Sequence, residues 1–293
     1  MLNLDSTLAL THGNPLGLFA VLTHLDPTNG SYTAIFAPED RMEPFLGQIR
    51  NPSGSRIAHM TFLAPQNTLN VIALPGLLDH LASEAGELGA MYLMAEIDER
   101  STFFETFRRS GFSTYTWQRI WRYLQLPPET DRSVHWRFAT DIDTVSIRGL
   151  IQSLVPPLIQ PVEPSLESRP TGMLYRRSDQ ILAYAELTYG PHGICVQPFI
   201  HPTTENVYEL IVDLLHSIPY QHGRPIFIIV RSYQGWLETI LEQFSTEISS
   251  RQAVMVKHLA ISQRVLQTLR LPSIENGHVE PSTPFARSKF QQK

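Results

Sequence analysis

The two halves of this 293-residue sequence repeat one order of predicted elements. The first half reads as strand, amphipathic helix, apolar strand, short helix and aromatic strand, over residues 56–63, 76–88, 90–97, 102–110 and 112–124. The second half reads in the same order, over residues 193–200, 207–218, 225–230, 236–244 and 252–260. Phe104 and Leu237 hold matching places, at a separation of 237 − 104 = 133 residues. Five elements repeated at a near-constant separation predict two similar domains.

The order strand, helix, strand restricts the fold further. A helix that crosses over between two strands joins them in parallel, so each half is expected to contain a parallel pair. Segments at 31–36, 172–177 and 181–189 read as antiparallel hairpin strands, and each final strand is expected to add antiparallel at the edge. The predicted fold class is therefore α/β, of the α+β kind. Each of two tandem domains is expected to have a mixed, mostly antiparallel sheet with one parallel strand pair flanked by helices.

Proline-rich segments mark the predicted boundaries. Leu126-Pro127-Pro128 disfavours helix and separates a domain at 1–126 from a second domain at 133–262. Another proline-rich stretch, 155–170, reads as a long surface connection. The tail at 271–293 carries further prolines, lacks periodicity and is predicted to be disordered.

Composition excludes several classes of protein. A hydrophobic content of 42% and a charged content of 17% are typical of a globular chain. The formal net charge of -5 argues against nucleic acid or an anionic membrane as partner, because both attract basic surfaces. Neither a secretory leader nor an apolar run long enough to span a membrane is visible, so a cytoplasmic location is expected.

No metal site is expected. Cys195 is the only cysteine, which rules out an intramolecular disulfide and a cysteine-rich zinc site. It is predicted to be a small buried residue of a strand. His192, His201 and His222 fall in predicted turns, without the helical spacing of a metal-binding pair. They are interpreted as surface histidines.

Two neighbouring segments carry a resemblance to a known family. Glu87-Leu88-Gly89-Ala90 ends a helix and leads into an apolar strand, and the segment 104–112 closes the next helix with Gly111-Phe112. This arrangement resembles the GCN5-related N-acetyltransferase (GNAT) superfamily. The resemblance covers residues 32–124 and, more weakly, 136–259. It implies two GNAT-like domains in tandem.

The resemblance also implies acetyl-CoA as co-substrate. Family members bind it between two parallel strands that splay apart, with the pyrophosphate on a glycine-containing loop at the start of the following helix. By this resemblance the backbone of Phe62, Leu63 and Ala64 would hold the pantetheine arm. Thr68 and Ala73 would face the pyrophosphate, where Ala73 fits a small-residue position and Thr68 replaces a basic or amide residue.

Both halves depart from the family's pattern. In the second half Glu205 stands at the basic or amide position of the loop, and Tyr208 and Leu210 stand at its glycine positions. The family's usual general acid is a tyrosine, which is replaced by Phe107 in the first half and Leu241 in the second. The acetyl-CoA motif is therefore degenerate in both halves.

Two carboxylates could still carry chemistry. Glu96 ends an apolar strand, where it would act as a general base if it were shielded from water, or would simply meet solvent. Glu186 alternates onto the opposite face from Ala185 and Leu187, toward a cleft or toward solvent. The sequence leaves both pairs of alternatives open.

Two further segments are candidates for contact with a ligand or a partner. Arg231–Trp236 follows a buried strand and opens a helix, which suits ligand binding or, alternatively, a helix cap closed by Ser232. Trp117–Tyr123 alternates large and polar residues, as a strand at a domain or dimer contact would.

Two functions follow from these observations. The resemblance implies an acyl-CoA-dependent N-acyltransferase that acts on a small-molecule or peptide amine. The degenerate motif favours a catalytically inactive tandem GNAT-like module that binds a ligand or a protein partner, and the aromatic strand would suit a homodimer. Whether the chain is an enzyme stays open at this point.

Overall fold

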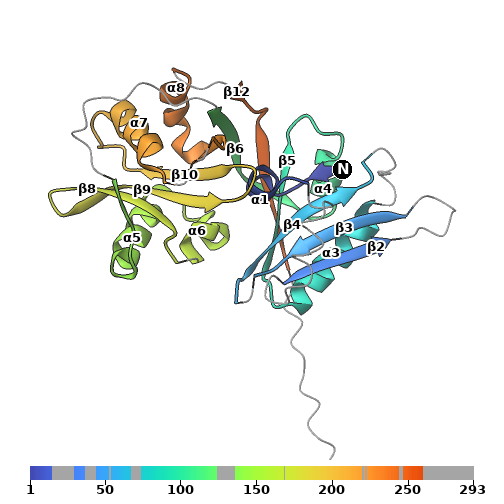
Figure 1. The fold of residues 1–293 in the computed structure, drawn as a ribbon. Helices are drawn as coiled ribbons and strands as arrows, with labels where there is room; N and C mark the ends of the chain where they lie inside the picture. The colour runs from blue at the N-terminus through green and yellow to red at the C-terminus, as the bar shows by residue number, and fades with distance from the viewer. Residues whose placement is uncertain are drawn as a thin grey trace, which may run out of the picture. The chain divides into compact units, whose positions relative to one another are not determined.

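The helices and strands follow the predicted repeat in both halves (Figure 1). The computed structural model describes residues 1–14, 30–36, 44–52, 54–66, 74–123, 136–167, 169–219, 221, 223–243 and 247–259. The first half forms β1 (Leu2–Asn3), α1 (Ser6–His12), β2 (Ser31–Phe36), β3 (Phe45–Arg50), β4 (Ile57–Ala64), α3 (Leu74–Glu87), β5 (Tyr92–Asp98), α4 (Phe104–Arg109) and β6 (Ser113–Tyr123). The predicted boundary between the domains and the predicted tail lie outside the described residues.

The second half adds further elements before its repeated ones. It forms β7 (Trp136–Phe138), η2 (Asp141–Asp143), α5 (Thr144–Leu154), η3 (Gln160–Val162), α6 (Pro164–Glu167), β8 (Gly172–Arg177), β9 (Gln180–Tyr189), β10 (Ile194–Ile200), α7 (Val207–Ser217), β11 (Ile226–Arg231), η4 (Ser232–Leu237), α8 (Glu238–Leu241), β12 (Glu247–Ile248) and β13 (Gln252–His258).

Apolar spacing and one glycine explain the local structure of the first half. α3 buries Leu77, Leu78 and Leu81 on one face, as the helical spacing of its leucines predicts. β5 is apolar on both faces because the sheet is covered on both sides there. Gly111 follows α4 with a φ of 86°, a left-handed conformation that allows the chain to turn directly into β6.

The predicted parallel pairs are confirmed, and each pair opens along its length. β4 pairs in parallel with β5 over residues 57–59, and β10 pairs in parallel with β11 over residues 194–196. β4 continues to Ala64 and β10 to Ile200 without further pairing to these partners in the described chain. Each half therefore contains two parallel strands that splay apart toward their C-terminal ends.

The final strands of the two halves are exchanged. β13 lies between β5 and β6 and pairs antiparallel with both, and β6 also pairs antiparallel with β11. One sheet therefore runs in the order β2-β3-β4-β5-β13-β6-β11-β10-β9-β8-β7. The mixed sheet and the repeated arrangement are confirmed. The edge position predicted for the final strands is wrong, because each is paired on both sides in the middle of the sheet.

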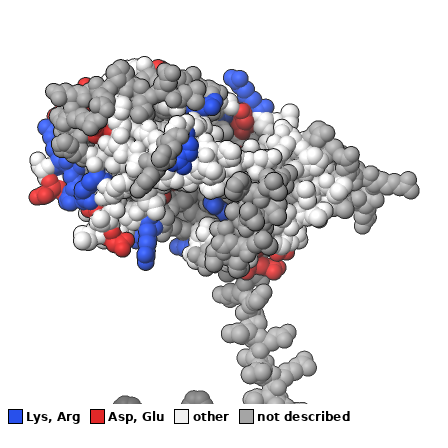
Figure 2. Space-filling model, in the orientation of Figure 1, with Lys and Arg blue, Asp and Glu red and all other residues white. Residues whose placement is uncertain are grey.

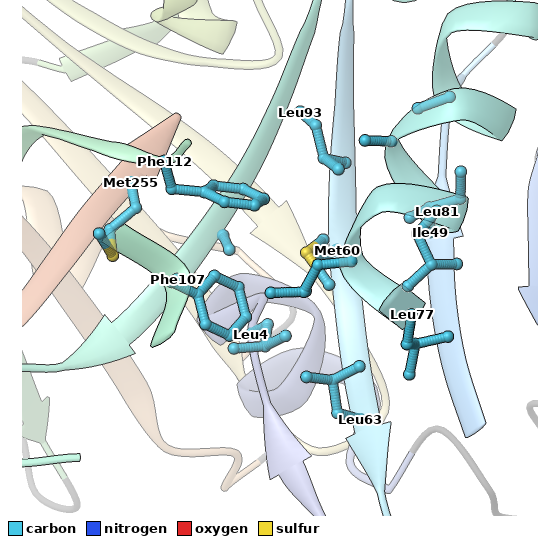
Figure 3. Packing of buried hydrophobic residues seen from close by; sticks show 14 of the residues in the cluster. Leu4, Ile49, Met60, Leu63, Leu77, Leu81, Leu93, Phe107, Phe112 and Met255 are labelled. Carbon is cyan, nitrogen blue, oxygen red and sulfur yellow. The ribbon is translucent and has the colours of Figure 1, made fainter. Parts of the chain in front are cut away.

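Because of the exchange, the last strand of each half contributes side chains to the hydrophobic core of the other half. Met255 of β13 belongs to the buried cluster of the first half, together with Leu77 and Phe107 (Figure 3). Trp121 and Tyr123 of β6 belong to the buried cluster of the second half. Each core is therefore complete only when the other half supplies its last strand.

Two segments differ from prediction. The stretch 155–170 contains η3 and α6, and Val155, Ile159 and Val162 are buried in a third hydrophobic cluster. Its interpretation as a surface connection is wrong, because apolar residues between the prolines pack inward. The helix predicted at 236–244 is shorter, since a 3-10 turn over 232–237 precedes α8, which ends at Leu241.

Replacing Trp121 with alanine tests the exchange. The side chain is fully buried in the core of the second half, so we expect a loss of about 3 to 5 kcal/mol in the free energy of unfolding. Hydrogen exchange should show the first loss of protection in β10 and α7. Phe107→Ala is the matched control, because it should weaken protection first in α3 and β5. Loss confined to the first half in both variants would contradict the exchange.

Candidate functional site

A cavity of about 700 Å³ is lined by both halves of the chain. The first half contributes residues from the N-terminal segment, β3, β4 and β5. The second half contributes residues from α5, α6, β9, β10 and β11. This volume lies in the range of small-molecule sites. The cavity is therefore the candidate functional site.

Arg231 is the buried cation of this cavity. It ends β11, is 5% exposed, and donates from Nη1 to the Gln118 side-chain oxygen at 2.5 Å. The same nitrogen lies 3.7 Å from a carboxylate oxygen of Glu96. Burial alone lowers the pKa of Arg231, but the nearby carboxylates of Glu163 and Glu96 raise it above its usual value, so the side chain remains a guanidinium. Its Nε is buried and has no hydrogen-bond partner among the described residues.

Glu96 lies on the opposite wall and is held by two partners. One carboxylate oxygen accepts a hydrogen bond from the backbone N–H of Ser6 at 2.9 Å, and the other lies near Arg231. The side chain is 10% exposed. Solvent exposure, one of the two alternatives for Glu96, is therefore wrong. A role as general base stays a prediction, and it would require these contacts to loosen.

A second group of carboxylates lies beside Arg231. Glu163 accepts hydrogen bonds from the Tyr233 hydroxyl at 3.0 Å, the Gln197 amide at 3.2 Å and the Ser165 hydroxyl at 3.4 Å. Ser165 also contacts the carboxylate of Glu186. Burial and then the charge of Glu163 raise the pKa of Tyr233, so its phenol stays protonated and donates. Glu186 lines the cavity, as one of its two alternatives predicted.

His59 and Cys195 complete the chemistry of the walls. Burial and then the charge of Arg50 lower the pKa of His59 from 6.5 to about 4, so the imidazole is neutral at physiological pH. Burial raises the pKa of the Cys195 thiol. The predicted buried position of Cys195 in a strand is confirmed, and its protonated thiol is a poor nucleophile.

The splayed strands of the first half are filled by the N-terminal residues. Leu2 and Asn3 of β1 pair with Leu63 and Phe62 of β4. The backbone N–H of Leu4 then donates to the carbonyl of Thr61 at 3.0 Å, and its carbonyl accepts from the N–H of Glu96 at 2.8 Å. Leu4 thus bridges β4 and β5, and its side chain is buried in the core of the first half (Figure 3).

The splayed strands of the second half are filled by a side chain. The Gln234 amide donates to the carbonyl of Pro198 at 2.6 Å, and its oxygen accepts from the backbone N–H of Ile200 at 2.8 Å. Gln234 is 2% exposed. Pro198 stands 198 − 194 = 4 residues after the first paired residue of β10. Thr61 stands 61 − 57 = 4 residues after that of β4. Equivalent carbonyls are therefore occupied by different groups of the same chain.

Ser232 and the aromatic strand, two other predicted features that the structure describes, do not line the cavity. Ser232 bonds to Thr116 at 3.0 Å and does not cap its helix, so the helix-cap interpretation is wrong. Trp117–Tyr123 forms the domain contact through β6. Thr68, Ala73 and His222 fall outside the described residues.

Two arginines of the second half form ion pairs near the surface. Arg177 and Glu205 lie 2.7 Å apart, and Arg137 and Asp143 lie 2.6 Å apart. Figure 2 shows acidic and basic side chains lying among one another over β8 and α5. Glu205, at the expected pyrophosphate position, therefore takes part in an exposed ion pair, which contributes little to stability.

Two kinds of feature are absent from the described residues. No group of three or more histidine, cysteine, aspartate and glutamate side chains in the described ranges is placed to hold a metal ion. Within the same ranges, no helix combines the length and the apolar character needed to cross a membrane.

Comparison with known proteins identifies the fold. Neither a protein-family model nor a curated protein matches the sequence. A GCN5-related N-acetyltransferase from Sphaerobacter thermophilus is similar in structure at 12% identity and a TM-score of 0.53, over 83% of this chain and 85% of that chain. One from Kribbella flavida is similar at 12% identity and a TM-score of 0.52, over 84% of this chain and 97% of that chain. The chain has the GNAT fold.

The N-terminal strand holds different places in the two GNAT-like halves. In the second half β7 pairs with β8 at the end of the sheet. In the first half β1 lies between the splayed strands instead. Phe62 and Leu63, expected to present free backbone groups, are paired with the N-terminal residues. A pantetheine arm could contact them only after β1 had left.

Gln234→Ala tests the bridge of the second half. The change leaves the Pro198 carbonyl and the Ile200 N–H buried without partners, so we expect a loss of roughly 2 to 4 kcal/mol in the free energy of unfolding. Urea denaturation measures it. Gln180→Ala, at an exposed position of β9, is the control and should change stability by less than about 0.5 kcal/mol. If both variants changed the free energy of unfolding by a similarly small amount, the bonds of Gln234 to Pro198 and Ile200 would not contribute to stability.

The lowered pKa of His59 predicts a pH dependence of stability. His59 binds a proton near pH 6.5 in the unfolded state but only near pH 4 in the folded state. The contribution of its neutral form to the free energy of unfolding is therefore fully present above pH 6.5 and is lost as the pH falls from 6.5 toward 4. We expect a loss of about 2 kcal/mol between about pH 7.5 and about pH 5. His59→Gln should remove this part of the slope, whereas His201→Gln, outside the cavity, should keep it. An unchanged slope in His59→Gln would contradict the assignment.

Proposed function

We propose that this chain is a catalytically inactive GNAT-fold protein that binds a small molecule in the cavity between its two halves. One observation supports this function above the others. Thr61 and Pro198 hold equivalent carbonyls in the two splayed pairs, and the chain itself occupies both. Because splayed strands bind acyl-CoA through such free backbone groups in the family that the sequence resembles, neither half offers the usual place for the pantetheine arm.

The residues at the expected catalytic positions support the same proposal. Phe107 and Leu241, which replace the tyrosine acid, are fully buried and have no proton to donate. Glu205 would place a negative charge near the phosphates of a bound CoA. Arg177 offsets part of this charge, and no basic residue of the loop replaces the one that the family uses.

The cavity has the features of a binding site that the splayed strands lack. It is large enough for a small molecule, and its buried walls carry a guanidinium, carboxylates and a neutral imidazole. A cavity with convergent polar groups is the usual location of a ligand site. The alternative, acyl transfer from acetyl-CoA, would require Leu4 or Gln234 to leave a buried position.

A thermal-shift titration of the full chain with acetyl-CoA and with free CoA tests this proposal. A ligand present at a hundred times its dissociation constant stabilises the folded state by about 2.7 kcal/mol, which raises Tm by several degrees. We expect no rise with either compound at millimolar concentration. A saturable rise, together with release of CoA in the presence of an amine, would favour the acyltransferase instead.

A further inference from the structure

The carboxylates that line the cavity already have partners within the protein. Asp5 lies 4.0 Å from Arg50, and Glu96 lies 3.7 Å from Arg231. The third carboxylate, that of Glu186, accepts a hydrogen bond from the hydroxyl of a nearby serine. A cationic ligand would have to compete with one of these contacts, so the lining does not favour a cation.

The charge of the lining is opposite to that of the whole chain. The chain has a formal net charge of -5. Guanidinium groups nevertheless outnumber carboxylates by one in the lining, and they belong to Arg50, Arg56, Arg148 and Arg231. Arg148 is exposed on α5 and has no ion-pair partner among the described residues. One anionic group of a ligand would balance this excess by pairing with Arg148.

Three neutral side chains of the lining make no hydrogen bond to another described residue. They are the hydroxyls of Thr7 and Thr188 and the imidazole of His59, and each side chain is half-buried. His59 is neutral at physiological pH, so its ring carries one N–H donor and one nitrogen acceptor. A threonine hydroxyl also both donates and accepts. The group that complements all three is a hydroxyl, because an ammonium group only donates and a carboxylate only accepts.

These neutral groups come from different elements around one space. Thr188 of β9 pairs with Cys195 of β10, and both residues line the cavity from the second half. His59 of β4 pairs with Met94 of β5, and both line it from the first half. Thr7 lies in α1. A ligand that bonds to all three groups must therefore carry several hydroxyls along its length.

We infer that the cavity binds a polyhydroxylated monocarboxylate, such as a sugar acid, with its carboxylate at Arg148 and its hydroxyls at Thr7, His59 and Thr188. The inference rests on the proposed function, because it names the chemical class of the ligand for the same site. An uncharged polyol would leave Arg148 without a partner. A fatty acid would leave the three neutral groups without partners. A phosphate monoester carries up to about two negative charges, which exceed the excess of one guanidinium.

Five six-carbon probes separate these classes. Gluconate carries a carboxylate and hydroxyls, sorbitol lacks the charge, glucamine carries an ammonium group instead, sorbitol 6-phosphate carries a phosphate, and hexanoate lacks the hydroxyls. Their binding to the full chain is measured by saturation-transfer NMR, which detects millimolar affinities, and acetyl-CoA is titrated in parallel.

Gluconate is expected to bind tightest. Sorbitol should bind about two- to fivefold more weakly, because it lacks one exposed ion pair. Hexanoate should bind at least about tenfold more weakly, because it lacks three hydrogen bonds. Glucamine should bind more weakly than sorbitol, since its ammonium group would meet the excess of guanidinium groups, and sorbitol 6-phosphate should bind no tighter than gluconate.

Two variants test the two parts of the ligand separately. Arg148→Gln should weaken gluconate about two- to fivefold and leave sorbitol unchanged. Thr188→Val removes a hydroxyl and keeps nearly the same shape, so it should weaken gluconate and sorbitol about two- to tenfold and leave hexanoate unchanged. Arg100→Gln and Thr102→Val change exposed residues that do not line the cavity, and they should have no effect.

The outcomes separate this inference from the proposed function. Sorbitol or glucamine binding as tightly as gluconate would overturn the anionic part of the ligand, and hexanoate binding as tightly would overturn the hydroxylated part. Tighter binding of sorbitol 6-phosphate, or no binding by any of the probes, would also overturn the inference. The proposed function would stand in each of these cases, whereas saturable binding of acetyl-CoA would overturn that function itself. The expected order of affinities, with each variant affecting only its own part of the ligand, would support the inference.

Discussion

A buried chain of hydrogen bonds joins the segments on which the rest of the structure depends. Arg231 donates to Gln118, Gln118 donates to Gln252 at 2.8 Å, and Gln252 accepts from the Ser6 hydroxyl at 3.0 Å. The Ser6 N–H then bonds to Glu96. These residues come from β11, β6, β13, the N-terminal segment and β5. Ser6, Gln118 and Arg231 are buried, so the loss of one partner leaves others unsatisfied. The strand exchange and the position of the N-terminus therefore stabilise each other.

The two splayed strand pairs pose one physical problem that the chain solves in two ways. Where parallel strands separate, their backbone N–H and C=O groups lose their partners and need others. In the first half the N-terminal residues form a short strand, and the N–H of Leu4 donates to the carbonyl of Thr61. In the second half the side-chain amide of Gln234, in the turn after β11, donates to the carbonyl of Pro198. Both solutions use backbone groups that the splayed strands would otherwise leave free, and both come from the same chain.

The sequence predicted the elements of the fold better than their pairing. The repeated order of strands and helices, the parallel pairs and Gly111 could be predicted because they depend on local periodicity and turn residues. The exchange of β6 and β13 could not be predicted, since both strands carry apolar side chains that suit either pairing. Trp121 and Met255 would be buried in either arrangement.

The candidate site was predictable only in part. Glu96, Glu186 and Arg231 stood out as polar residues on or beside apolar strands, and the structure brings all three to one cavity. Glu163 was missed because its neighbouring prolines resembled a surface loop. The role of Leu4 was missed because nothing in an isolated N-terminal leucine distinguishes a core residue from one that bridges two strands.

The strand exchange has a consequence for the order in which the chain can fold during its synthesis. The edge of β5 stays unpaired until β13 has been made, which is 252 − 98 = 154 residues after β5 ends. At about 5 to 20 residues per second, a ribosome needs about 8 to 30 s to cover that distance. Until then this edge of β5 lacks its native partner, and an unpaired strand edge is a form that readily pairs with other chains. The sheet and the core of the first half can therefore reach their native form only after β13 has been synthesised.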